Sequence, residues 1–417
     1  MESLPLADGS RVLLGLGNTV DYELRWDGEV VTDLLAAHDV QSVPEHPGHA
    51  VEDEKDLVSS LLAHLAAGTG GEHFVASAAV LLEFAGRFGV RTTLGGTNLR
   101  AALAMRALGQ ASTVHLVTTG RATYDLLPDD QAVISSAQGD SFDPHVVVQF
   151  PAGAEVRVGD RTVVAPSANR VIYVNDLPNQ ELVIAEEFGD AAARADVILV
   201  SGFNSISDPD TLTSRIADVR RHLARRKAGA LAVYEHGAFH VSALAASVRR
   251  ELGPSVDVWS CNEDELQDQL QREVDLLSPQ QVLAAVREAH AEVGARTLVV
   301  HTRFWALAIG GDVEDRRAMV LGGTVLAAVR YCFGDVVTTA HLEEVTGWAQ
   351  QPSARSFVDA ITDLADEVTC CAAYDVVSSA PTTIGLGDAF VGGLVAALAQ
   401  RFEAGARATA TGPEPLA

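Results

Sequence analysis

Short apolar runs recur along the chain and are its clearest structural signal. They lie at residues 12–16, 114–117, 197–200, 230–233, 256–259 and 298–300. Because a strand buried on both faces has a nearly continuous apolar sequence, these runs predict strands of a parallel sheet. Ala101, Ala104, Met105 and Leu108 recur with the period of a helix. Residues 212–226 and 279–293 also read as helices, so the alternation predicts an α/β fold with helices on both faces of the sheet.

Two segments interrupt this alternation with shorter strand patterns. The first, Tyr22 to Val31, carries Asp27-Gly28, a pair typical of hairpin turns. The second contains patterns at 146–150, 155–158, 161–164, 170–174 and 181–184. Gly159-Asp160 between two of them predicts a hairpin. Because such β-rich material does not suit a helix-covered sheet, we expect a smaller β-rich lid domain inserted into the larger one.

The interruptions set the predicted domain boundaries. The large α/β domain is expected to be discontinuous and to comprise residues 1–21, 51–145 and 185–402. The lid domain is expected to comprise 22–50 and 146–184. Within this scheme, charges, histidines and prolines at 41–56 predict a loop. Residues 403–417, rich in Ala, Gly, Thr and Pro, predict a flexible tail.

Composition narrows the classes of partner. The 417 residues include 30 Lys and Arg against 56 Asp and Glu, a formal net charge of −26. Such a surface repels nucleic-acid phosphates and anionic membranes. No apolar run approaches the roughly 20 residues of a membrane span, and Met1 to Ser10 lacks the pattern of a signal peptide. The four cysteines form no metal-binding pattern. We therefore expect a cytoplasmic monomer or small homo-oligomer that binds small molecules.

The strongest chemical signal is the segment from Thr382 to Gly393. Gly385 and Gly387 permit a tight turn that brings the backbone close to an anion. An apolar helix follows, and the free N–H groups at its start can bind a phosphate or a developing negative charge. Asp388 in that first turn can accept the proton of an attacking hydroxyl. An ordinary helix cap with glycines for packing would explain the same residues.

Two motifs together resemble a known family. Gly385-Leu386-Gly387-Asp388 is similar to the anion-hole motif of ribokinase-like sugar kinases, with Asp388 as the base. Asn262-Glu263-Asp264-Glu265, directly after a predicted strand, resembles the N-E-x-E motif of the ADP-dependent glucokinase and phosphofructokinase family. In that family this motif lies where the magnesium–phosphate complex is held. The resemblance implies a ribokinase-like fold, Mg²⁺ held by Glu263 and Glu265, and ADP as the phosphoryl donor.

Further segments extend the resemblance from about residue 11 to residue 400. Val233-Tyr234-Glu235 stands where the family has H-x-E, so Glu235 is a third candidate magnesium residue although valine replaces the histidine. Asp21 aligns with a sugar-binding aspartate. Gly96, Thr97 and Asn98 align with the G-G-Q-A segment that lines the sugar site. The resemblance also puts Arg170, His301 and Leu386 on the nucleotide side.

The resemblance implies Mg²⁺-dependent phosphoryl transfer from ADP to a hydroxyl of a sugar, sugar phosphate or nucleoside-like acceptor. Motifs on the nucleotide and metal side match better than those on the sugar side, which predicts an acceptor other than glucose. Two alternatives stay open. One is an ATP-dependent ribokinase-like kinase, and the other is a catalytically inactive ligand-binding regulator with the same fold.

Overall fold

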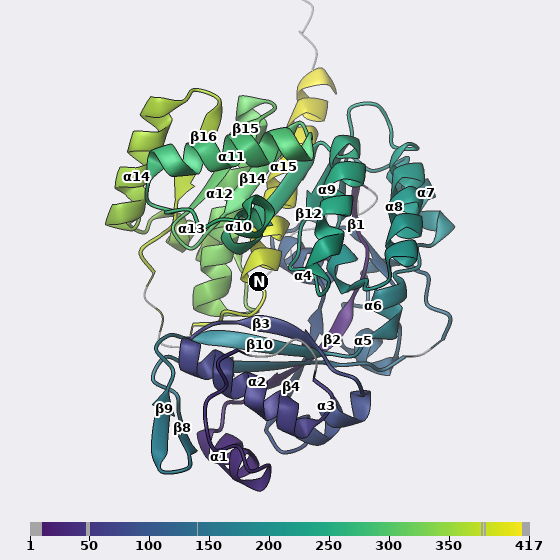
Figure 1. The fold of residues 1–417 in the computed structure, drawn as a ribbon. Helices are drawn as coiled ribbons and strands as arrows, with labels where there is room; N and C mark the ends of the chain where they lie inside the picture. Colours follow the sequence, from purple (N-terminus) through teal and green to yellow (C-terminus); the bar gives the residue numbers. More distant parts are fainter. Residues whose placement is uncertain (1–10, 47–50, 140, 377, 379–380, 411–417) are drawn as a thin grey trace, which may run out of the picture.

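The computed structural model describes residues 11–46, 51–139, 141–376, 378 and 381–410. The chain forms two sheets, each with its own helices (Figure 1). The order of strands in the nine-stranded sheet is β16 (Val368–Ala372), β15 (Trp305–Gly310), β14 (Thr297–His301), β13 (Val258–Asn262), β12 (Leu231–Glu235), β11 (Val197–Val200), β1 (Val12–Leu14), β5 (Thr113–Leu116) and β6 (Ala132–Ser135). In this order, all neighbouring strands from β14 across to β6 pair in parallel, whereas β15 is antiparallel to both of its neighbours.

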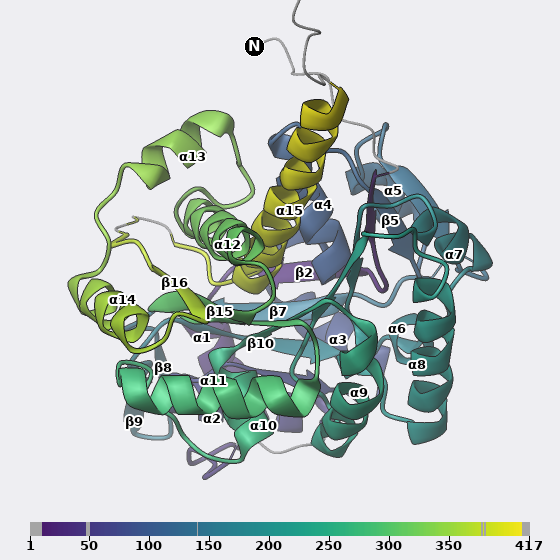
Figure 2. The same ribbon diagram turned by 90° about the horizontal axis from the view of Figure 1, so that it is seen from above.

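Helices cover both faces of the large sheet (Figure 2). One face packs against α7 (Glu186–Ala192), α8 (Pro209–Leu223), α9 (Ala245–Leu252), α10 (Glu263–Leu270), α11 (Pro279–Val293) and α14 (Pro352–Leu364). The other packs against α4 (Thr97–Ala107), α12 (Val313–Phe333) and α15 (Leu386–Ala410). The shorter helices α5 (Arg121–Leu126), α6 (Leu177–Glu181) and α13 (Thr339–Thr346) lie in connections. The prediction of a mostly parallel, helix-covered sheet is confirmed.

The smaller sheet is mixed and has a different surface on each side. Its strand order is β3 (Gly71–Phe74), β10 (Asn169–Val174), β7 (His145–Phe150), β2 (Thr19–Leu24) and β4 (Val90–Gly95). Its helices are α1 (Gly28–Ala37), α2 (Glu54–Ala67) and α3 (Ala78–Ala85), and β8 (Glu155–Val158) and β9 (Arg161–Val164) form a separate hairpin. The predicted hairpin at Gly159-Asp160 is therefore confirmed.

Alternation along the small-sheet strands separates the two faces. Val146, Val148 and Phe150 of β7 pack into a core with α1, α2 and α3. Since successive side chains on a strand point to opposite faces, the residues between them point away from those helices. We call this opposite side the cleft face; it carries Thr19, Asp21, Glu23, Glu72, His145, Val147, Gln149, Arg170 and Ile172.

Several local predictions differ from the structure. Asp27-Gly28 starts α1 instead of a hairpin, because the Asp27 side chain accepts hydrogen bonds from the backbone N–H groups of Glu29 and Val30. The predicted strand at 181–184 is absent from the described chain, because α6 extends to Glu181 and Leu182 then has a φ of 42°.

The domain limits differ as well. The segment 51–145, assigned to the large domain from sequence, contributes β3, β4 and the first residue of β7 to the smaller sheet. The predicted loop at 41–56 ends where α2 begins at Glu54, and its residues 47–50 lie outside the described residues. Helix α15 extends to Ala410, so the first part of the predicted tail is helical; residues 411–417 lie outside the described residues.

Candidate active site

A cavity of about 300 Å³ lies between the cleft face and the carboxyl ends of the large-sheet strands. Glu235, Asn262 and His301, which end β12, β13 and β14, line one side. The first turn of α15 lies beside them with Asp388. Ligands of open α/β sheets bind at the carboxyl ends of the strands, so this is the expected place for a substrate site.

The turn before α15 presents its backbone and Asp388 to the cavity. Gly385 has a φ of 69°, a left-handed conformation that side chains disfavour. A Cβ at Gly385 would also lie 3.1 Å from the Arg100 side chain. Because α15 starts at Leu386, its first N–H groups have no partner within the helix. The turn therefore combines an anion-binding backbone with a carboxylate.

Arg100 of α4 connects this turn to the small sheet. Its Nη2 donates to Asp21 Oδ2 at 2.8 Å, and its Nε lies 3.7 Å from Asp388 Oδ2. Glu23 is a further partner at 3.4 Å. Burial acts to lower the pKa of Arg100, but the charges of Asp21 and Asp388 outweigh burial and raise it. Arg100 thus orients carboxylates of both walls of the cavity.

Glu235 and Glu265 form a buried acidic pair at the strand ends. Glu235 Oε1 lies 3.1 Å from His301 Nε2, whereas Glu235 Oε2 is buried without a hydrogen-bond partner among the described residues. Glu265 Oε2 accepts from the backbone N–H of Asn262 at 2.9 Å, as in a capping box. Burial, and then the charge of Glu235, raise the pKa of Glu265 well above its usual value. Burial thus disfavours the ionised form of Glu265, and a cation beside the pair would stabilise that form.

These residues fit a hydrated Mg²⁺. No group of three or more His, Cys, Asp or Glu side chains among the described residues is arranged to hold a metal directly. Magnesium usually keeps several of its waters and is held through few carboxylates. The unpartnered Glu235 Oε2 can accept a hydrogen bond from such a water. The donor set thus suits indirect binding.

His301 joins the metal side to α15. Its ring stacks on Phe390 of α15, with centroids 4.5 Å apart and planes inclined by 27°. Its Nε2 contacts Glu235, as described above. Val233, which stands where the family has histidine, is fully buried in the core. The imidazole beside Glu235 therefore comes from β14 instead of from the same strand.

The cleft face adds charged groups of both signs. Burial acts to lower the pKa of His145, but its hydrogen bond and ion pair with Asp176 outweigh burial and raise the pKa to about 9. Burial acts to raise the pKa of Glu72, but a 3.0 Å hydrogen bond from His240 and nearby positive charges lower it. His145 is thus cationic and Glu72 anionic at neutral pH.

Arg170 is the guanidinium of the cavity that lacks a close protein partner. Its side chain makes no hydrogen bond and no ion pair within 4.0 Å in the described part of the chain. Burial lowers its pKa, and the charges of Asp388 and Glu72 offset burial only in part. A half-buried guanidinium with free donors is suited to bind phosphate oxygens.

The cavity brings together most of the residues predicted from sequence. Those that line it are Asp21, Gly96, Thr97, Arg170, Glu235, Glu265, His301, Gly385, Gly387 and Asp388. Asn98, Glu263 and Leu386 do not line it. Asn98 is fully buried and donates to the backbone oxygen of His115 at 2.7 Å, so it supports the fold. Glu263 Oε1 instead accepts from the Arg303 backbone N–H at 3.3 Å.

Sequence reasoning missed several lining residues. Arg100 lies one helical turn after Gly96, so the glycine segment could have indicated it. Glu72 and His145 lie in separate strands without a motif. Only the pairing of β3, β10 and β7 brings them beside Arg170.

Comparisons with known proteins agree with this geometry. The profile described as "ADP-specific Phosphofructokinase/Glucokinase conserved region" matches residues 10–396. A phosphofructokinase from Pyrococcus horikoshii OT3, crystallised with AMP, superposes with a TM-score of 0.71 at 15% identity over 96% of this chain and 100% of that chain. An ADP-dependent kinase in complex with fructose-6-phosphate and ADPβS has a TM-score of 0.72 at 12% identity over 94% of this chain and 95% of that chain.

A search of curated protein sequences found no match. At such low identities the solved structures establish the fold alone, but the profile covers nearly the whole chain. The protein therefore belongs to the ADP-specific phosphofructokinase/glucokinase family.

Proposed function

We propose that the protein transfers the β-phosphoryl group of ADP to a hydroxyl of a sugar, sugar phosphate or nucleoside-like acceptor. The observation that carries this proposal is the shared cavity of Asp388, the turn at Gly385 and Arg170. A base, anion-binding N–H groups and a guanidinium with free donors are the parts that phosphoryl transfer requires. Family membership supports ADP as the donor.

Each wall has its own part in the proposed reaction. Asp388 accepts the proton of the acceptor hydroxyl, while the N–H groups of Gly385 to Asp388 bind the transferring phosphoryl group. Arg170 holds the phosphates of the donor. Glu235 and Glu265 would hold Mg²⁺ through its waters, and the ion would neutralise charge on the phosphates. Asp21, Thr97 and the cleft face orient the acceptor, and closure of the small domain excludes water.

The acceptor side holds charges of both signs. Asp21 is already engaged by Arg100, whereas His145 and Arg170 contribute positive charge and Glu72 negative charge. Such a wall can bind hydroxyls through Glu72 and an anionic group of the acceptor through His145, since Arg170 is assigned to the donor. We therefore keep neutral and phosphorylated sugars as acceptor classes.

The setting of the enzyme follows in part from the described chain. No described helix has both the length and the apolar character needed to span a membrane. Cys261, Cys332, Cys370 and Cys371 are all unpaired. We propose a cytoplasmic enzyme, since thiols stay reduced there, and expect a monomer or small homo-oligomer with small-molecule ligands.

The proposal is tested by measuring donor consumption with Mg²⁺ and ADP or ATP over a panel of sugars, sugar phosphates and nucleosides. We expect ADP-driven transfer to at least one acceptor, with ATP slower. Because in-line transfer tolerates little misplacement, a site that fits the β-phosphate of ADP at Asp388 disfavours the longer donor. Faster turnover with ATP than with ADP would identify ATP as the phosphoryl donor in place of ADP. Nucleotide binding without turnover on any acceptor would favour the alternative of a catalytically inactive ligand-binding regulator.

A further inference from the structure

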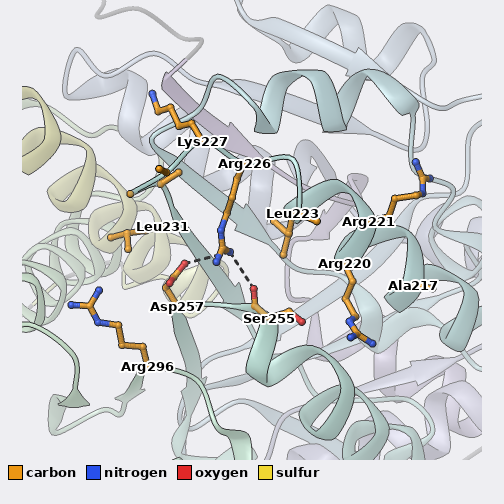
Figure 3. A pocket seen from close by; sticks show the side chains of 14 residues that line it. Ala217, Arg220, Arg221, Leu223, Arg226, Lys227, Leu231, Ser255, Asp257 and Arg296 are labelled. Carbon is orange, nitrogen blue, oxygen red and sulfur yellow. Dashed lines mark hydrogen bonds and ion pairs between the residues drawn. The ribbon is translucent and has the colours of Figure 1, made fainter.

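A second, larger hollow lies at the opposite ends of the same strands. Its volume is about 880 Å³, and it is bordered by the end of α8, the turn before β12 and the segments that precede β13 and β14 (Figure 3). Leu231 starts β12 at this hollow, whereas Glu235 ends the strand at the active-site cavity. The two sites are therefore separated by the length of the strand.

The charge of this hollow is opposite to that of the whole chain. Its charged lining residues are Arg220, Arg221, Arg226, Lys227, Arg296 and a single acid, Asp257. The whole chain has a net charge of −26 and only 30 Lys and Arg residues. A concave cationic region in an otherwise acidic surface focuses the local potential and attracts anions.

Some of these cations are occupied by protein partners. Arg226 donates to the backbone oxygen of Ser255 at 3.1 Å and lies 3.4 Å from Asp257 (Figure 3). Lys227 pairs with Asp196 at 2.6 Å. Arg221 pairs with Glu186 and Asp218. The charges of Arg221, Arg226 and Lys227 are therefore balanced by groups of the protein itself.

Arg220 and Arg296 lack such partners. Neither guanidinium makes a hydrogen bond, or an ion pair within 4.0 Å, with any described residue. The charge of Arg296 lowers the pKa of Asp312, but less than the backbone hydrogen bonds to Asp312 and the charge of Arg401 do. In Figure 3 the two arginines lie on either side of Arg226. The guanidinium groups of Arg220 and Arg296, which have no protein partner in the described chain, thus lie on either side of Arg226, which has such partners.

The rest of the lining leaves space for a ligand of small-molecule size. Leu223 and Leu231 give an apolar part of the surface, and the turn between α8 and β12 contributes Gly229 with a φ of 83°. A Cβ at Gly229 would meet no atom within 4 Å. The volume lies within the range of about 300–1,000 Å³ that is typical of small-molecule sites.

We propose that this hollow binds a small polyphosphate anion at a site separate from the active site. The planar donors of arginine match phosphate oxygens in pairs, and an anion with several phosphate groups can engage Arg220 and Arg296 on either side of Arg226. An extended polyanion such as nucleic acid would meet the acidic surface around the hollow. A free oligophosphate and the phosphate chain of a nucleotide share the required chemistry.

The test is calorimetric titration at low ionic strength with inorganic tripolyphosphate and, separately, ATP. The proteins are wild type, Arg220→Gln/Arg296→Gln, and the control Arg317→Gln/Arg355→Gln, which removes the same charge from exposed positions of α12 and α14. All three keep the active site, so the difference between the two double variants reports the hollow. We expect at least tenfold weaker binding, or loss of one equivalent, in Arg220→Gln/Arg296→Gln only.

The two ligands distinguish the two sources of phosphate. A larger difference between the double variants with ATP would assign the site to nucleotides, and a larger difference with tripolyphosphate to free oligophosphates. Equal isotherms for both double variants with both ligands would overturn the proposal. If the pocket variant does not melt cooperatively, the single variants Arg220→Gln and Arg296→Gln replace it, each with an expected weakening of at least threefold.

Discussion

The two walls of the active-site cavity are built in different ways. On the large-domain wall, functional groups end parallel strands or start α15, as Glu235, His301 and Asp388 do. On the small-domain wall, they alternate with core residues within strands, as Glu72 and Arg170 do. The first wall presents mainly carboxylates and backbone donors. The second presents charges of both signs, each held by its own partner or left free.

This difference separates chemistry from selection. Groups at strand ends and a helix start are fixed by backbone geometry, which suits a reaction that is the same for every substrate. Groups on the face of a sheet can change singly without altering the fold, since each contributes one side chain to the surface. We expect the large-domain wall to govern turnover and the small-domain wall to govern binding and closure.

The largest expected effect tests the large-domain wall. Asp388→Asn should lower kcat by about 10²-fold or more, because the amide cannot accept the proton of the attacking hydroxyl. ADP affinity should change little, since Arg170 and the backbone donors remain. Steady-state kinetics and calorimetry with ADP measure the two quantities.

Asp264→Asn is the matched control, because Asp264 is an exposed carboxylate that does not line the cavity. It should keep kcat within about twofold of wild type. Turnover near wild type in Asp388→Asn would remove Asp388 from the mechanism and with it the proposed role of this wall.

The same contrast explains what the sequence could predict. The turn at Gly385–Asp388 and the motif at Asn262 each place several functional groups within a few residues, so local sequence is informative. Six of the nine large-sheet strands were equally recognisable as apolar runs, whereas β6, β15 and β16 were not predicted. His145 and Glu72 could not be found, because their proximity depends on pairing between strands that are far apart in the chain. Hairpin and helix were also confused at Asp27, where an N-cap and a turn use the same residue types.

The second prediction tests whether the positive charge of His145 stabilises the small-domain wall. Its folded-state pKa of about 9 lies above the ordinary value of about 6.5. The protonated ring therefore stabilises the folded state fully below about pH 6.5, and this stabilisation is lost as the pH rises through 9. A difference of this size corresponds to roughly 3 kcal/mol.

His145→Gln should accordingly be less stable than wild type at pH 6, with the difference shrinking by pH 10. Denaturant unfolding at both pH values measures it. His46→Gln, at an exposed histidine, is the control and should follow wild type. A stability difference that is independent of pH would contradict the charged state of His145.

A smaller effect ranks the acidic residues of the large-domain wall. Glu235→Gln should raise the Mg²⁺ concentration for half-maximal activity about tenfold, the lower end of the range for residues that support a metal indirectly. Glu263→Gln should change it less, because Glu263 does not line the cavity. Magnesium titration of activity compares the variants, and equal midpoints for all three proteins would exclude Glu235 from the metal site.

The smallest expected effect concerns a direct contact between the two walls. Gln149 Oε1 accepts from both the backbone N–H and the hydroxyl of Thr383, each at 3.2 Å, just before the turn at Gly385. Gln149 also pairs with Arg170 across β7 and β10. We expect this contact to keep Arg170, the proposed donor-binding residue, in register with the turn that carries Asp388.

Gln149→Ala removes an acceptor from two donors that remain. Since a hydrogen bond contributes about 1 kcal/mol net, kcat/KM for ADP should fall about fivefold. Gln41→Ala, at an exposed glutamine of the same domain, should leave kcat/KM unchanged. The fall should appear mainly in KM, because Asp388 itself is intact and only its alignment with Arg170 is loosened. An equal fall in kcat with constant KM would instead assign Gln149 to the chemical step, and the division of labour between the two walls would fail at this contact.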